Sequence, residues 1–231
     1  MSNQVDHLID RRLRTPRAAA VAGILFAVLM GVSWTLIRIS IPADPSDGGQ
    51  WLEERSGTVT LALSLVPFAG IAFLWFIGVV RDRMGHLEDR FFSTVFFGSG
   101  LLYLAMMFVA AALAGSLVSS YALIPTQLID SGTYTFGRVL MFRISSVYAI
   151  RMAGVVMFSL GTIAVRTRII PRWLAFLTFG LALALLLGIG SSLWVTLIFP
   201  AWVLIISIDI LVVNLRRREA GHQDDLFAKG E

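Results

Sequence analysis

Arg151 is the residue whose chemical type and position in this sequence most strongly favour a binding site. It lies in an otherwise apolar run, and Tyr148, Ser159 and Thr162 share its helical face, a sector about 80° wide at roughly 100° per residue. Ionisable groups inside a membrane span are energetically costly, so their positions usually mark a role. Because a guanidinium offers five hydrogen-bond donors, this polar stripe is a candidate site for a carboxylate or a lipid phosphate.

Two prolines bear on how Arg151 is held. Pro67 and Pro200 are predicted to lie at a similar depth, in helices that run in the same direction. A proline in the middle of a helix kinks it and frees the carbonyl four residues earlier, here those of Leu63 and Thr196. Two interpretations remain open: Arg151 binds these carbonyls and holds the bundle together, or it lines a water-accessible cavity and binds an anion.

Asp209 is the other ionisable residue deep in an apolar run. It differs from Arg151 by about 12 Å of depth at the helical rise, whereas Arg166 lies closer to its level. We therefore predict a structural ion pair between Asp209 and Arg166, with a proton-relay role as the alternative. Arg38 and Arg143 lie near the outer boundary, where we expect them to extend to the lipid headgroups.

Several classes of chemistry lack the residues that they require. The chain has no cysteine, which excludes disulfide exchange, thiolate catalysis and iron–sulfur ligation. The three histidines, His7, His86 and His222, lie outside the apolar runs, which excludes bis-histidine haem within the bundle. We therefore expect no cofactor, no metal site and no catalytic residue.

The elements that position these residues are apolar helices. Hydrophobic residues make up 57% of the 231 residues and charged residues 15%, against about 25% charged residues in soluble domains. Each long apolar run is near or above the roughly 20 residues that cross a bilayer, except the fifth, which is short. The sequence predicts an all-α polytopic integral membrane protein with these six spans: Ala18–Ile39, Thr58–Val80, Phe92–Leu117, Val139–Val165, Trp173–Gly188 and Leu193–Leu215.

The distribution of arginine predicts how the spans are oriented. Basic residues concentrate in the N-tail (1–17), in the second and fourth connections and in the C-tail (216–231), while the first, third and fifth connections hold few. Since cytoplasmic loops carry an excess of arginine and lysine, both termini are predicted to be cytoplasmic, on either side of a transmembrane domain over 18–215. The expected location is the cell (plasma or bacterial inner) membrane.

Two further features are assigned to the outer membrane interface. Trp34, Trp51 and Trp194 fall near the outer ends of the predicted spans, where amphipathic rings concentrate. The connection from Ser116 to Arg138 is half apolar and is interrupted by Pro125, so we expect it to lie on or dip into the interface rather than to cross the membrane.

These observations predict a non-enzymatic membrane protein that is an accessory or scaffold subunit of a larger envelope complex. The alternative is a small transporter, or a lipid- or anion-binding protein with a mid-membrane site at Arg151. The expected partners are the lipid bilayer and other membrane-protein subunits. Nucleic acid is excluded as a partner, because the net charge of +4 comes from arginines placed at span ends rather than from a basic surface.

Overall fold

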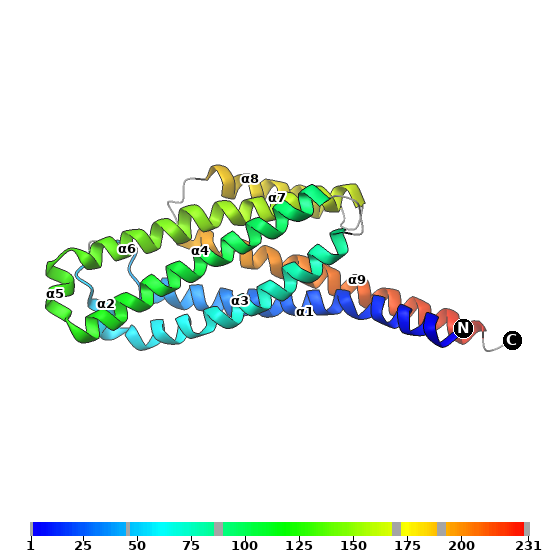
Figure 1. The fold of residues 1–231 in the computed structure, drawn as a ribbon, viewed down its shortest axis with the longest axis horizontal. Helices are drawn as coiled ribbons and strands as arrows, with labels where there is room; N and C mark the ends of the chain where they lie inside the picture. The colour runs from blue at the N-terminus through cyan, green and yellow to red at the C-terminus, as the bar shows by residue number, and fades with distance from the viewer. Residues whose placement is uncertain (1, 45–46, 86–89, 168–171, 189–192, 229–231) are drawn as a thin grey trace.

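Helices form every regular element in the described part of this computed structural model, which covers residues 2–44, 47–85, 90–167, 172–188 and 193–228 (Figure 1). Side chains are described for 18–44, 47–82, 91–165, 173–188 and 194–213. The elements are α1 (Ser2–Ser40), α2 (Gln50–Glu54), α3 (Ser56–Gly85), α4 (Arg90–Leu123), α5 (Pro125–Asp130), α6 (Thr133–Arg143), the π-helix η1 (Ile144–Ala149), α7 (Ile150–Thr167), α8 (Arg172–Leu187), the 3₁₀-helix η2 (Leu193–Leu197) and α9 (Ile198–Ala228).

Five of the described helical segments are long and apolar enough to cross a membrane, so the prediction of an all-α, multi-pass membrane protein is supported at this level. They are Ala18–Ser40, Ser56–Asp82, Phe91–Leu123, Thr133–Val165 and Trp194–Val213. The fifth predicted span corresponds to a shorter apolar helix, Trp173–Leu187. At about 1.5 Å per residue, the two longest segments reach roughly 50 Å, well beyond a hydrocarbon core of about 30 Å.

The predicted connection between the third and fourth spans is mostly helical, and the helices on either side of it are longer than the predicted spans. α4 continues to Leu123 rather than ending at Leu117, and the next long segment begins at Thr133 rather than at Val139. Pro125 interrupts the chain as expected, but it does so by starting α5, where its missing N–H has no helical partner to lose. The turn into α6 is made by Gly132, whose positive φ of 72° suits a residue without a Cβ.

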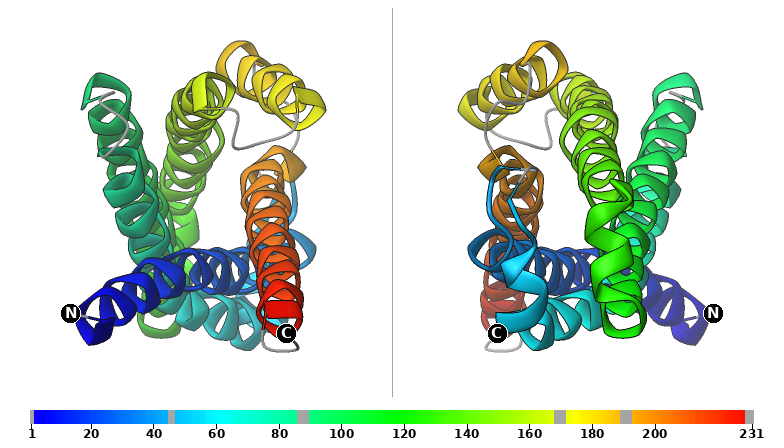
Figure 2. Two further views of the ribbon diagram at one scale, coloured as in Figure 1. Left: turned by 90° about the vertical axis from the view of Figure 1, so that its right-hand side faces the viewer. Right: turned by 90° about the vertical axis from the view of Figure 1, so that its left-hand side faces the viewer.

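The long helices form a curved row rather than a closed ring (Figure 2). α1 packs against both α3 and α9, α4 lies between α3 and α7, and α8 packs on the outside of α7. Both termini lie at one end of the molecule, and α2 and α5 lie at the other (Figure 1). We call this second end the loop end.

A cluster of aromatic rings joins four of the long helices. Phe26 of α1, Phe73 of α3, Tyr103 of α4 and Phe199 of α9 are buried, and the centroids of neighbouring rings lie 4.5–6.5 Å apart. Edge-to-face and offset ring pairs at these separations stabilise beyond simple burial. The cluster therefore fixes α1, α3, α4 and α9 relative to one another.

Two of the three tryptophans assigned to the outer interface are core residues instead. Trp34 is 1% exposed and Trp51 is 3% exposed, so neither ring can reach lipid headgroups. Trp194, on η2, is 55% exposed and keeps the character of an interfacial residue. The rings of Trp34 and Trp51 both belong to the buried hydrophobic core.

Candidate functional site

The four residues of the predicted polar stripe have different surroundings. Arg151 is half-buried, and its Nη1 donates to the carbonyl of Val147 on the same helical run, at 3.1 Å. Tyr148 is 58% exposed, whereas Ser159 is buried. Thr162 donates to the carbonyl of Phe158, one turn earlier.

Tyr148 lies in the π-helix η1, whereas the other three residues of the predicted stripe lie in α7. A π-helix closes its hydrogen bonds over five residues instead of four, so the angle between successive side chains departs from the α-helical value. Tyr148 lies within Ile144–Ala149, and Arg151 follows in α7. The wheel that groups these residues assumes an uninterrupted α-helix, which this span does not have.

The prolines and the predicted ion pair are placed as follows. Pro67 lies inside α3, as expected for a kink. Pro200 lies in the first turn of α9, directly after η2, where a proline removes no α-helical hydrogen bond. Asp209 is half-buried in α9, while the side chain of Arg166 lies outside the described residues, so their pairing stays a prediction.

A buried arginine at the loop end, Arg138, organises the segment that follows α1. It is 3% exposed, and its Nη1 contacts the Asp47 carboxylate at 2.9 Å in an ion pair. Its Nη2 donates to the carbonyls of Pro42 at 2.6 Å and Asp44 at 3.3 Å. One guanidinium on α6 thus binds three groups of the α1–α2 segment, which a planar fork of five donors can do.

Tyr134 and Trp51 complete this cluster. The Tyr134 hydroxyl donates to Asp47 at 2.6 Å and accepts from Trp51 Nε1 at 2.8 Å and from Arg138 Nη1 at 2.7 Å. The turn before Trp51 needs Gly49, which has a positive φ of 76° and lies so close to Ile129 that a Cβ would approach it to 2.9 Å. We refer to Asp47, Trp51, Tyr134 and Arg138 as the loop-end clamp.

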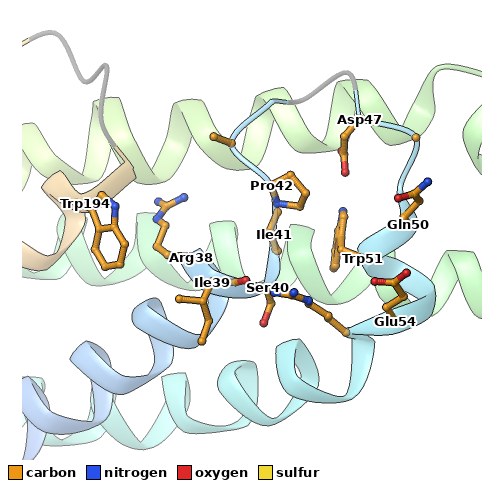
Figure 3. Close-up of a pocket in the computed structure, with 13 residues that line it drawn as sticks. Arg38, Ile39, Ser40, Ile41, Pro42, Asp47, Gln50, Trp51, Glu54 and Trp194 are labelled. Carbon is orange, nitrogen blue, oxygen red and sulfur yellow. Dashed lines mark hydrogen bonds between the residues drawn. The ribbon is translucent and has the colours of Figure 1, made fainter.

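Two residues of the clamp, Asp47 and Trp51, line a pocket of about 540 Å³ at the loop end (Figure 3). Arg38 lies beside Trp194 at one side of the pocket, and Asp47, Trp51 and Glu54 lie at the other (Figure 3). The remaining lining comes from the end of α1, the segment that follows it, and α2 with its C-cap: Ile39, Ser40, Ile41, Pro42, Ala43, Gly48, Gln50 and Arg55. A volume of this size is within the range of small-ligand sites.

Arg38 is the pocket residue whose bonding is incomplete. Its guanidinium lies over the Trp34 ring, 5.2 Å from the centroid, but its Nε and Nη2 are buried without an acceptor among the described residues. These two nitrogens form one edge of the guanidinium, the edge that binds carboxylate or phosphate oxygens in a bidentate manner. By contrast, Arg55 donates to the carbonyl of Ile39, and Asp47 is paired with Arg138.

The pocket presents charged, polar and aromatic side chains to a ligand. Within the described ranges, no group of three or more histidines, aspartates or glutamates could hold a metal ion. The pocket lining includes the Arg38 guanidinium, whose Nε and Nη2 have no acceptor among the described residues, the carboxylates of Asp47 and Glu54, hydroxyl and amide groups, and two indole rings. An oxyanion that accepts hydrogen bonds from Arg38 is the ligand that this set of groups suits best.

The pocket residues were not identified as a site from the sequence. Arg38 was assigned to the lipid headgroups and Arg138 only to the end of a connection. The available signals were local: Tyr134 and Arg138 are one helical turn apart, and Asp47 precedes a Gly-Gly pair that allows a tight turn. Neither signal indicates which acidic side chain forms an ion pair with which basic side chain.

Comparison of the chain with protein-family models, with curated proteins and with solved structures found no match.

Proposed function

We propose that this chain is a non-enzymatic membrane protein, with six spans and both termini in the cytoplasm, that binds a small anionic group at its outer end. The observation that carries the proposal is the pocket at the loop end, lined by an arginine whose Nε and Nη2 have no acceptor among the described residues. A buried donor without a partner costs free energy. An oxyanion in the pocket, met by a turn of the Arg38 side chain, removes that cost.

The six-span topology is supported by two independent features. Both termini lie at the same end of the molecule (Figure 1), as an even number of crossings requires. The arginine-rich tails and connections share that end, which the positive-inside rule makes cytoplasmic. α8 is the short fifth span of about 24 Å, a length that membranes accommodate by local thinning.

The pocket rather than Arg151 is the better candidate for an anion site. Arg151 already donates to the carbonyl of Val147 and does not line the pocket. Arg38, in contrast, faces a space large enough for a ligand beside exposed Trp194. The predicted anion-binding alternative is therefore retained, with its site moved to the loop end.

Thiol labelling tests the proposal. Because the chain contains no cysteine, an introduced cysteine is the only thiol that the reagent can label. In Ala43→Cys, which lines the pocket, a membrane-impermeant anionic thiosulfonate should react from outside intact cells. The measured quantity is the ratio of the labelling rate with the anionic reagent to the rate with a cationic reagent. Adding Arg38→Gln to Ala43→Cys should lower that ratio by about three- to ten-fold, since a nearby positive charge concentrates anions.

Two matched positions control the labelling experiment. Thr126→Cys, exposed on α5 and outside the pocket, should react from outside with rates that Arg38→Gln leaves unchanged. Asp82→Cys, at the opposite end of α3, should react only after the membrane is permeabilised. Labelling of Ala43→Cys only after permeabilisation would overturn the orientation, and rates insensitive to Arg38 would overturn the anion site.

A second candidate function is an accessory or scaffold subunit of a larger membrane complex. It is favoured by exposed apolar side chains at the tip formed by α4 and α6, where Leu123 is 80% and Phe136 67% exposed. Apolar groups outside the hydrocarbon layer favour a covering partner. Purification from native membranes in a mild detergent should then yield a larger assembly that Leu123→Ser with Phe136→Ser disperses, and recovery of the unaltered chain as a monomer would contradict this function.

A further inference from the structure

We infer that the anion in the pocket is the phosphodiester of a membrane phospholipid, bound by Arg38, with an acyl chain lying along the exposed apolar face of α1. This inference rests on the anion site proposed above and names its ligand class. It follows from three properties of the pocket: its depth, its connection to the lipid-facing surface, and the geometry of its cation.

The pocket lies at the level where lipid headgroups are found. Arg38 is two residues from the end of the apolar segment Ala18–Ser40, which at 23 residues spans the hydrocarbon core with little to spare. Trp194, on the neighbouring wall, is 55% exposed, as is typical of a ring at the membrane–water interface. A phosphate drawn from the adjacent leaflet therefore reaches Arg38 without leaving its normal depth.

The lining of the pocket continues onto the lipid-facing side of α1. Ile39 lines the pocket and is 54% exposed. Val32, Val28 and Val21 lie on the same helical face, seven, eleven and eighteen residues earlier, and are 46%, 50% and 58% exposed. An acyl chain has a continuous apolar path from the pocket toward the membrane centre.

The geometry of Arg38 suits a phosphodiester. The Trp34 ring supports one face of the guanidinium, and the edge that carries Nε and Nη2 has no acceptor among the described residues. That edge is buried, so the Arg38 side chain turns to present it to the pocket, where two phosphate oxygens match it. Arg55 and Glu54 line the same pocket with charges that offset each other, and the Asp47 carboxylate is occupied by Arg138 and Tyr134, so Arg38 supplies the positive charge for the phosphate.

The test compares a phospholipid with its separate parts, using the full chain purified in a nonionic detergent and stripped of lipid. The probes are a short-chain phosphatidylglycerol, the diacylglycerol with the same chains, and glycerol 3-phosphate. Native mass spectrometry should show one phosphatidylglycerol retained per chain, with little binding of either part alone. Arg38→Gln should weaken retention of phosphatidylglycerol about ten-fold or more, as loss of a bidentate charged contact does.

Matched variants separate recognition from a general effect of charge. Arg143→Gln removes an exposed arginine near the same end that does not line the pocket, and should change retention less than two-fold. Arg38→Lys keeps the charge but loses the planar edge, and should give an intermediate loss. It also guards against a folding defect in Arg38→Gln.

The outcomes distinguish the lipid from a soluble anion. If glycerol 3-phosphate binds as tightly as the lipid and depends equally on Arg38, the anion site stands and the lipid inference fails. If diacylglycerol binds as well as phosphatidylglycerol, the phosphate makes no contribution and the inference also fails. If Arg38→Gln and Arg143→Gln behave alike, both the lipid inference and the proposed anion site are overturned.

Discussion

Replacing Arg138 by methionine is expected to lower the free energy of unfolding by about 3 kcal/mol, the low end of the loss typical of breaking a buried ion pair. The guanidinium contacts Asp47, the Tyr134 hydroxyl and the carbonyls of Pro42 and Asp44. Methionine fills a similar volume but satisfies none of these groups, and each buried polar group left without a partner adds a desolvation cost. The value lies at the low end because Asp47 is 19% exposed and keeps its bond from Tyr134.

A denaturant titration in mixed micelles measures this loss, with Arg151→Met as the matched control. Arg151 has one described hydrogen bond, to a carbonyl of its own helical run, so its replacement should cost about 1 kcal/mol or less. Asp47→Asn should restore part of the stability of Arg138→Met, because it removes the charge that the first substitution leaves without a counterion. Equal losses in the two arginine variants would contradict the clamp and would favour a structural role for Arg151.

Replacing Gly23 by alanine is expected to lower the free energy of unfolding by about 2 kcal/mol, although alanine is the better helix former. A Cβ at Gly23 of α1 would lie 2.0 Å from Ser207 Oγ of α9 and 2.8 Å from the Phe76 ring of α3. No atom pair tolerates 2.0 Å, so α1 and α9 must separate or Ser207 must change its rotamer. Loss of the close contact weakens the packing of the three helices that meet there.

Ser207→Ala provides the matched test of that explanation. Its hydroxyl is buried and has no hydrogen-bond partner among the described residues, so the single substitution should be neutral or stabilising by up to about 1 kcal/mol. In that background, Gly23→Ala should recover at least half of its loss, because the closest clash is gone. Both measurements come from thermal unfolding in detergent. A Gly23→Ala variant as stable as the original chain would show that α1 and α9 do not approach as described.

Much of the fold could be predicted because a membrane imposes it on the sequence. Every backbone donor and acceptor in hydrocarbon must be satisfied within the helix, so long apolar runs can only be helices. Outside the apolar runs that constraint is absent, and the helix ends do not follow the ends of the runs. α1 begins at Ser2 rather than near Ala18, α9 continues past Leu215 to Ala228, and α4 extends six residues past Leu117.

The clamp shows why the site could not be predicted in the same way. Arg138 and Asp47 are 91 residues apart in sequence, and no periodicity links them. Arg38 resembles any arginine at the end of a span, which reaches headgroups unless something covers it. Only the fold places the α1–α2 segment above Arg38 and brings Trp194 beside it (Figure 3).

The sequence by itself determined that the long apolar runs are helices apolar enough to cross a membrane, and which chemistries lack their residues. These properties follow from composition and periodicity, which are local. The tertiary structure alone decided which polar side chains meet, that Arg138 is satisfied, and that two nitrogens of Arg38 are buried beside a pocket without an acceptor among the described residues. Those facts depend on how helices distant in sequence pack and where the α1–α2 segment folds back, and no local pattern encodes them.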